Sequence, residues 1–296
     1  MRERSPRSKS LLLNEKEMFR RYAAQHDIRY FIKFDEIDVT NEKSLRVSVA
    51  TYNQVIFPHP ENGTAMLALE RKATILQDGS VNVRAQPFGG GVKILNTKSL
   101  KEMVGEIQFD SERSNHERDF RILIQPLQWE VVKQFCLLHL ENPNDSEIES
   151  APDRELVEEF EETMGVELKR SQYAVGPMGF VIEENPVHTK NWYARGFSTV
   201  RVYRTYKVRL LDAELCKTLL DTSQRISDEE LGRWALNDKT GRANSVLALP
   251  LEGVRESYLT LPPETRYGKI DIENHKLDES VLAVLMDVDV PQYQRA

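Results

Sequence analysis

Asp-Arg-Glu-Leu-Val-Glu-Glu-Phe-Glu-Glu, residues 153–162, and Phe-Gly-Gly-Gly, residues 88–91, are the two stretches that decide the fold expected for this chain. In the first stretch, Leu156, Phe160 and the following Met164 recur every four residues, which predicts an amphipathic helix. Residues at i, i+3, i+4 and i+7 share one helical face. Four acids should therefore project together: Glu155, Glu158, Glu159 and Glu162.

Clustered carboxylates repel one another, so such a face has two interpretations. The first is an ordinary solvated surface, because runs of charge usually lie in water. The second is a binding site for a divalent cation such as Mg2+ or Mn2+, which prefers oxygen ligands. Pro152 lies just before the helix, and Asp153 is the predicted N-cap.

The residues before the glycines predict a β-hairpin. Residues 64–76 alternate as a strand does, Asp78-Gly79 favours a turn, and residues 81–88 return as a second strand. This second strand runs directly into Gly89, Gly90 and Gly91. The glycines and the acidic helix are separated by a long segment, at about 95–150.

Together these motifs resemble those of the Nudix hydrolases, whose signature leads from a glycine pair through a loop containing a glutamate into a helix of the form Arg-Glu-apolar-x-Glu-Glu. Residues 154–159 match the helical part without a gap. Two differences are clear: the long segment would be an insertion inside the motif, and Thr97 stands where the loop glutamate is expected. The resemblance covers at most about residues 64–254.

The resemblance implies an α+β fold, in which a Nudix-like mixed β-sheet is sandwiched between helices. It divides the chain into an N-terminal extension, residues 1–62, and a Nudix-like domain, residues 63–296, with a helical insertion. It also implies a hydrolase dependent on Mg2+ or Mn2+ that cleaves a phosphoanhydride in a nucleoside diphosphate linked to another moiety. By position, three acids match the family's metal ligands, Glu155, Glu158 and Glu159.

Other site residues follow from the resemblance or from the residues themselves. Arg154 matches the family's structural arginine and, with Glu158 and Glu159, completes the catalytic set. Gly89, Gly90 and Gly91 match the segment whose backbone approaches metal and phosphates. Glu162 is a further metal-ligand candidate from helix geometry alone. The general base is unassigned, and the candidates downstream of the helix are Glu229 and Glu230.

Substrate contacts outside the motif are predicted from residue type. Trp192, or alternatively Tyr193 or Phe88, could stack on a base, although each is equally a packing residue. Arg201 could bind phosphate, as could Arg195 and Lys207, and the competing interpretation is the wet face of a sheet.

Two functions of other classes stay open. A Nudix-like fold without the loop glutamate would suit a catalytically weak or inactive nucleotide-sensing or protein-interaction module, and a structural protein without a ligand is the third possibility. An enzyme is favoured if a carboxylate of the insertion folds back beside Glu158; the candidates are Glu102, Glu106 and Glu147.

Composition limits the remaining classes. The 296 residues carry a net charge of −7 and are 40% hydrophobic, which suits a sizeable core and makes nucleic acid an unlikely partner. No apolar run is long enough for a membrane span, and no signal peptide is visible. Cys136 and Cys216 are expected as buried thiols, which is typical of a cytoplasmic protein. The predicted partner is a nucleotide-derived small molecule, and a second copy of the chain or another protein is left open as a further partner.

The rest of the chain yields further predictions. Residues 1–10 form a basic tail, Pro58–Gly63 a linker, and residues 110–119 and 185–196 loops. The region before the linker is either a small appended domain or extra strands on the main sheet. Helices are expected at 15–26, 98–107, 128–140 and 227–236, and strands at 28–39, 45–57, 173–183, 197–211 and 245–251.

Overall fold

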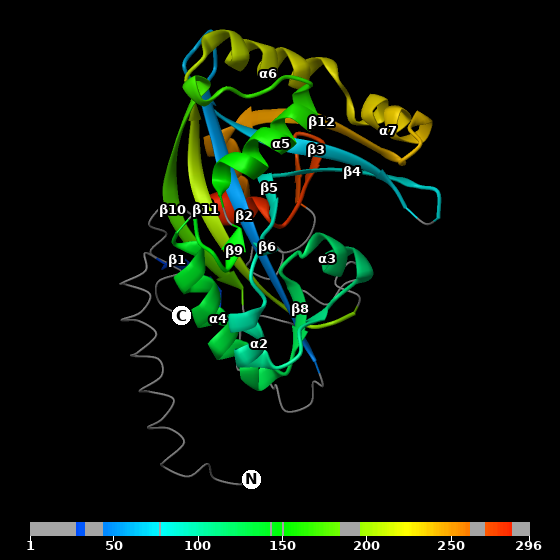
Figure 1. Ribbon diagram of the computed structural model, residues 1–296. Helices are drawn as coiled ribbons and strands as arrows, with labels where there is room; N and C mark the ends of the chain where they lie inside the picture. The colour runs from blue at the N-terminus through cyan, green and yellow to red at the C-terminus, as the bar shows by residue number, and fades with distance from the viewer. Residues whose placement is uncertain are drawn as a thin grey trace, which may run out of the picture.

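The structure is a computed structural model that describes residues 28–32, 44–76, 78–142, 144–149, 151–183, 196–260 and 270–285. These residues form a mixed α and β architecture around one large sheet of twelve strands, with a separate two-stranded sheet (Figure 1). The predicted helix at 15–26, the loop at 185–196 except Gly196, and the basic tail lie outside the described residues.

Strand β2 (Leu45–Pro58) organises the sheet, because four other strands pair with it. It runs parallel to β11 (Thr199–Leu210) and antiparallel to β3, β5 and β8. The other strands, in chain order, are β1 (Ile28–Ile32), β3 (Ala65–Ile75), β4 (Val81–Gln86), β5 (Phe88–Gly91), β6 (Lys93–Ile94), β7 (Gln108–Phe109), β8 (Arg121–Ile124), β9 (Ile148–Glu149), β10 (Tyr173–Glu183), β12 (Arg242–Pro250), β13 (Ile270–Ile272) and β14 (His275–Leu277).

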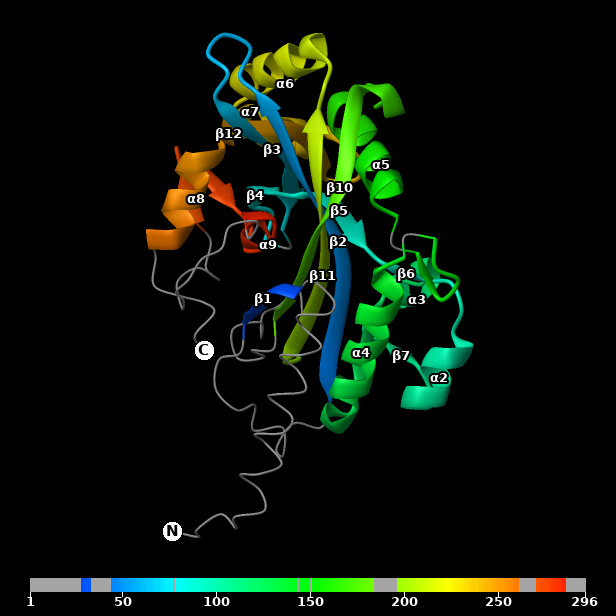
Figure 2. The ribbon, with the colours of Figure 1, turned by 90° about the vertical axis from the view of Figure 1, so that its left-hand side faces the viewer.

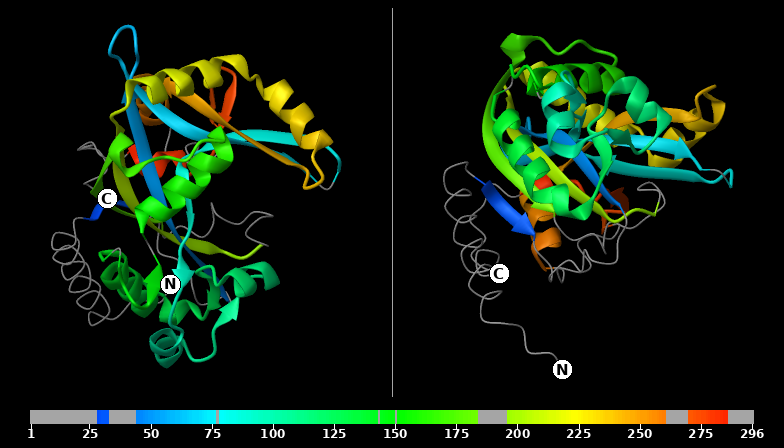
Figure 3. Two further views of the ribbon diagram at one scale, coloured as in Figure 1. Left: turned by 45° about the horizontal axis from the view of Figure 1, so that its top comes forward. Right: turned by 60° about the horizontal axis from the view of Figure 1, so that its bottom comes forward.

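Helices cover both faces of the sheet, as Figure 2 shows for α4 and α5 on one side of β2 and α8 and α9 on the other. The helices are α2 (Lys98–Val104), α3 (Glu112–Glu117), α4 (Trp129–Leu140), α5 (Pro152–Met164), α6 (Ala213–Arg225), α7 (Asp228–Asn237), α8 (Leu251–Thr260) and α9 (Val281–Leu285). Helices α6 and α7, yellow in Figure 3, lie along the part of the sheet made by β3, β4 and β12.

The core is divided by the sheet into several apolar clusters. On one face, α4 packs on β2, β8 and β11, and α5 and α6 pack on β2, β3 and β12. On the other face, α8 packs on β3, β12 and β13, and α9 packs on β2 and β11. Cys136 and Cys216 are buried free thiols, as their apolar context predicts.

The predicted hairpin is confirmed. Strands β3 and β4 pair from Ile75 opposite Val81 to Glu70 opposite Gln86, so the chain returns along β3 and enters β5 beside β2. Pro58 ends β2, and the residues after it form the tight connection to β3, where Gly63 N donates to the carbonyl oxygen of His59. This stretch is therefore a hairpin turn rather than the predicted linker, and residues 45–58 belong to the main sheet.

Two local predictions were wrong. Residues 110–119 contain a helical turn, α3, rather than only a loop, because the Ser111 side chain accepts a hydrogen bond from Ser114 N at its N-terminus. Strand β11 is buried along both faces as far as Tyr206, so Arg201 and Tyr203 do not form a wet face. The physical reason is that helix α9 covers the side that was expected to face solvent.

Candidate functional site

Helix α5 positions the acidic residues by burying its apolar side against the glycine strand (Figure 1). Leu156 and Phe160 are fully buried, and the Phe160 ring lies 5.8 Å from the ring of Phe88 between centroids. Pro152 is the first helical residue, where its missing N–H costs nothing, and Ala151 occupies the N-cap position. Asp153 is thus inside the helix, and its prediction as the N-cap was wrong.

Three successive glycines meet three different neighbours in β5. A β-carbon on Gly89, whose φ is +137°, would overlap the backbone carbonyl oxygen of Thr51 on β2. A β-carbon on Gly90 would overlap the carboxylate of Glu155 on α5. The bare backbone therefore lets strand and acidic helix approach each other closely.

Arg154 ties the start of α5 to the end of the insertion. Its guanidinium contacts three carboxylates: Glu149 at 2.8 Å, Glu158 at 2.8 Å, and Glu155. Burial raises the pKa of Glu155, and Arg154 opposes this rise. Strand β9 brings Glu149 to Arg154 through its pairing with β6. The carboxylate that folds back from the insertion is thus Glu149, which the sequence analysis did not single out.

A second group of charges lies beside Glu159. The Lys72 ammonium on β3 is 3.1 Å from a carboxylate oxygen of Glu159 and 2.8 Å from one of Glu70. Gln86 on β4 donates to the same Glu70 oxygen at 3.1 Å. Glu70 is fully buried, and burial raises its pKa to about 9, with the nearby Glu159 carboxylate adding to the rise.

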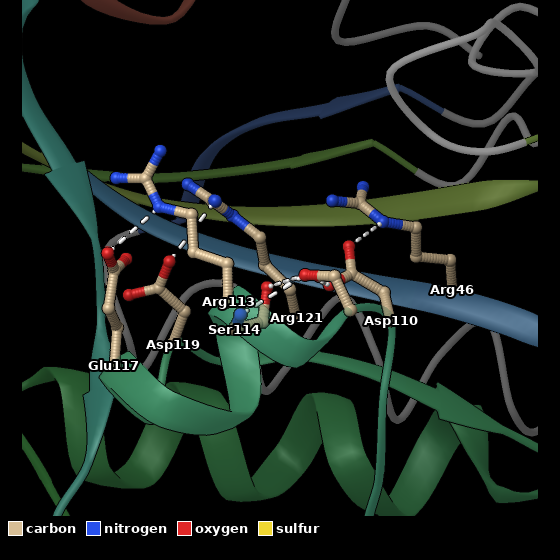
Figure 4. Close-up of polar contacts among 8 residues, drawn as sticks. Arg46, Asp110, Arg113, Ser114, Glu117, Asp119 and Arg121 are labelled. Atoms are coloured by element: carbon tan, nitrogen blue, oxygen red, sulfur yellow. Dashed lines mark hydrogen bonds and ion pairs between the residues drawn. The ribbon is translucent and has the colours of Figure 1, made fainter. Parts of the chain in front are cut away.

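The insertion supplies a wall beside the third glycine. A β-carbon on Gly91 would lie 3.3 Å from the Arg121 guanidinium and 3.4 Å from the Asp119 carboxylate, and these two side chains pair at 3.1 Å. Figure 4 shows Arg121 between Arg113 and Arg46, each facing a carboxylate of the insertion. Arg121 keeps 36% of its side chain exposed, whereas Arg46 is buried.

The four predicted acids of α5 do not all converge. Glu155 and Glu159 face the strands, through Gly90 and Lys72. Glu158 is 57% exposed, and among the described residues it has an ion pair with Arg154 only. Glu162 is exposed and has no hydrogen bond or ion pair within the same part of the chain. Two of the four acids are therefore exposed, and the other two face the strands.

The predicted substrate-binding residues and the other candidate acids are spread over several parts of the chain. Arg201 is buried and pairs with Glu183 at 3.0 Å and Glu279 at 2.8 Å, so its guanidinium is engaged inside the protein. Trp192 lies outside the described residues. Glu229 and Glu230 lie in the first turn of α7. Of the insertion acids considered for the site, Glu102 and Glu106 are exposed, and Glu147 accepts a hydrogen bond from Asn96 at 3.1 Å.

The donor set has the chemistry of a hard-cation site but not a preformed cluster. Carboxylate oxygens are the ligands that Mg2+ and Mn2+ prefer. Within the described residues, no three His, Cys, Asp or Glu side chains are grouped to hold a metal ion. Positive charge beside the acids comes instead from two side chains of the protein itself, Arg154 and Lys72.

Sequence reasoning missed five residues of this site: Glu70, Lys72, Asp119, Arg121 and Glu149. One signal was available for the first two, because i and i+2 on a strand share a face, so Glu70 and Lys72 must point together. No comparable local pattern marks the others, since the insertion reaches the site by pairing its strands β8 and β9 with β2 and β6.

No family model and no curated protein sequence matches this chain. None of the helices in the described segments is long and apolar enough to cross a membrane.

Proposed function

We propose that this protein is a Nudix-type hydrolase that depends on Mg2+ or Mn2+ and cleaves a phosphoanhydride bond in a nucleoside diphosphate linked to another moiety. The observation that carries the proposal is the packing of the Gly90 backbone against the Glu155 carboxylate. It joins a glycine-only stretch of strand to an anionic helix edge, and a cation-bound diphosphate needs both.

Glu155 and Glu159 would hold the cation, with Glu158 as the third acid of the resemblance. When bound, the cation supplies positive charge for the phosphate oxygens and polarises a water molecule. Arg154 would act as a positioning residue, because its contacts with Glu149, Glu155 and Glu158 restrict how these side chains turn. Gly90 and Gly91 would let the Glu155 carboxylate and the Arg121 guanidinium lie against the backbone of the strand.

Arg121 would bind the phosphate chain in place of Arg201. Its guanidinium is partly exposed and lies beside Gly91, whereas that of Arg201 is engaged by two carboxylates. A planar guanidinium can donate two parallel hydrogen bonds to phosphate oxygens. Trp192 remains a candidate for stacking on the base.

The test is release of nucleoside monophosphate from a panel of dinucleotides, nucleotide sugars and ADP-ribose with Mg2+ or Mn2+. We expect Glu158→Gln and Glu159→Gln each to abolish turnover, and chelation of the metal to abolish it in the wild type. Glu162→Gln, an exposed acid on the same helix, is the matched control for Glu158. Turnover that survived both substitutions would remove these residues from the mechanism.

A second function is favoured by one specific observation. Lys72 already pairs with Glu159 and Arg154 with Glu155, so each of these two acids has a protein cation beside it without a metal. A module that senses a nucleotide or binds a protein partner would need no turnover. It predicts that ADP-ribose raises the unfolding temperature by mass action while no product forms from any substrate of the panel.

A further inference from the structure

A cavity of about 600 Å³ lies where the turn between β2 and β3 meets the end of α6 and the turn between β13 and β14. Figure 2 shows the β2–β3 turn beside α6. The apolar part of the lining includes four buried side chains, those of Met66, Leu220, Leu247 and Leu249. This volume is typical of sites that hold small molecules, and none of the lining residues belongs to the candidate site described above.

His275 lines this cavity and is held in one orientation from behind. Its Nδ1 lies 3.2 Å from a carboxylate oxygen of Asp228, and the same oxygen accepts a hydrogen bond from Arg71 Nη1 at 2.9 Å. Arg71 is fully buried, and its Nη2 donates to the carbonyl oxygen of Ile226. Because a carboxylate only accepts hydrogen bonds, Nδ1 of His275 carries the hydrogen, and the neutral ring offers Nε2 as an acceptor.

His59 also lines the cavity, but it offers the opposite hydrogen-bonding group. Its Nδ1 accepts a hydrogen bond from Glu61 N at 3.2 Å, so its ring hydrogen is on Nε2, which is a donor. The turn that carries His59 is fixed by backbone hydrogen bonds, at 2.7 Å from His59 N to Thr64 O and at 2.9 Å from Gly63 N to His59 O. Within the part of the chain that the structure describes, the Nε2 atoms of His59 and His275 have no hydrogen-bond partner.

We propose that this cavity binds a neutral small molecule in which an amide is attached to an apolar body. The amide N–H would donate to His275 Nε2, and an amide oxygen would accept from His59 Nε2–H. The apolar body would lie against the buried leucines and Met66. Both rings are oriented before the ligand arrives, which reduces the entropy lost on binding. The inference does not depend on the proposed hydrolase.

The charges around the cavity favour a neutral ligand over an ion. The positive charge of Arg71 is opposed by Asp228, Glu273 adds a carboxylate to the wall, and no described lining residue is a lysine or an arginine. A carboxylate ligand has no donor for His275, and an ammonium ligand has no acceptor for His59. An amide supplies both groups without a charge.

The experiment follows the imidazole nitrogens of the full-length protein by 15N NMR during titration with three probes of similar size. The probes are benzamide, benzoate and benzylamine. We expect benzamide to shift the Nε2 signals of His59 and His275 in a saturable way, while Nδ1 of His275 keeps its hydrogen. Benzoate and benzylamine should bind about tenfold more weakly or less, because each leaves one ring nitrogen without a partner.

Substitutions test whether the two histidines make these contacts. His275→Phe and His59→Phe should each weaken benzamide binding about tenfold, because one hydrogen bond is lost and the ring shape is largely kept. His116→Phe changes an exposed histidine of α3 and should leave the affinity unchanged.

A larger side chain at the rim tests whether the ligand lies in the cavity. Gln224 is an exposed lining residue near the end of α6, and Gln224→Trp should abolish benzamide binding. Gln134→Trp, at an exposed position of α4, is the matched control and should not change it. Thr64→Trp blocks the cavity from the β2–β3 turn and replaces Gln224→Trp if that variant does not fold.

Three results would overturn the inference. The first is that benzamide leaves the His275 and His59 signals unshifted up to its solubility limit. The second is that benzoate or benzylamine binds as tightly as benzamide, because the site would then select a charge. The third is benzamide binding that survives both tryptophan substitutions, which would place the ligand elsewhere.

Discussion

The backbone of Gly90 lies so close to the carboxylate of Glu155 that a β-carbon at position 90 would overlap it. The preceding Gly89 faces the backbone of Thr51 in the neighbouring strand instead. A carboxylate at the end of a flexible side chain can turn aside, whereas a hydrogen-bonded strand cannot. Gly89 is therefore required for the strand pairing of the fold, whereas Gly90 allows the approach of Glu155 in the candidate site.

Alanine substitutions should separate these two roles in urea unfolding experiments. We expect Gly89→Ala to lower the free energy of unfolding by about 3 kcal/mol, because it combines a backbone clash with a strained φ. Gly90→Ala should cost less than about 1 kcal/mol but reduce any turnover about a hundredfold, because it displaces Glu155. Gly176→Ala, where the β-carbon would meet no atom within 4 Å, is the control. Equal losses of stability for positions 89 and 90 would contradict this assignment.

Arg154 should contribute to stability through the three carboxylates it contacts. Arg154→Ala leaves the largely buried Glu155 without its cation, and we expect a loss of about 2 kcal/mol in the free energy of unfolding. Arg154→Lys should recover less than half of it, because an ammonium cannot bridge three groups as a guanidinium does. Arg113→Ala, which removes an exposed pair with Glu117, should cost less than about 0.5 kcal/mol. An Arg154→Ala variant with the same free energy of unfolding as wild type would show that the network is only a surface contact.

Arg121 should affect substrate affinity rather than folding. If the hydrolase proposal holds, Arg121→Ala should raise KM about tenfold, because a charged hydrogen bond to phosphate is lost. Arg121→Lys should raise it less, since the charge remains. The change in unfolding temperature should be small, because the side chain is one-third exposed. Steady-state kinetics with an unchanged KM in Arg121→Ala would exclude the phosphate contact.

Glu183 should make stability depend on pH. Burial raises the pKa of Glu183 to about 7, and the attraction of Arg201 does not offset this rise. The folded state therefore binds the Glu183 proton more tightly than the unfolded state, whose glutamate pKa is near 4.5. This contribution is fully present below about pH 4.5 and is lost as pH rises through about 7.

Glu183→Gln removes that titration. We expect the free energy of unfolding of the variant minus that of wild type to increase by about 1–3 kcal/mol between pH 5 and pH 8. The variant thus becomes more stable relative to wild type as pH rises. Urea unfolding at both pH values measures this change. A difference that stayed constant, or that moved in the opposite direction, would mean that Arg201 keeps Glu183 ionised in the folded protein.

Local patterns in the chain were sufficient for the elements that carry the candidate site. The hairpin formed by β3 and β4 follows from alternation and the turn at Asp78 and Gly79, and α5 follows from the spacing of Leu156 and Phe160. Both signals depend on residues only a few positions apart. The same reasoning failed for α3, because one serine cap is a weak signal within a polar stretch.

The contacts between charged side chains did not follow from local patterns. Glu149 reaches Arg154 because β9 pairs with β6, and Arg121 reaches Gly91 because β8 and β5 both pair with β2. Pairing between distant strands depends on the register of the whole sheet, which no short window of sequence contains. Arg201 illustrates the opposite error: it alternates as a solvent-facing residue does, yet α9 covers that face.

The order of residues along this chain determined a glycine strand after a hairpin and an amphipathic acidic helix, because backbone freedom and side-chain periodicity are local properties. Only the folded arrangement decided that Glu155 would meet Gly90, that Lys72 would stand between Glu70 and Glu159, and that Glu158 would remain in solvent. The contacts of Glu155 with Gly90 and of Lys72 with Glu159 each join elements far apart in the chain. They exist because burial of the apolar side of α5 sets its distance and rotation relative to the sheet.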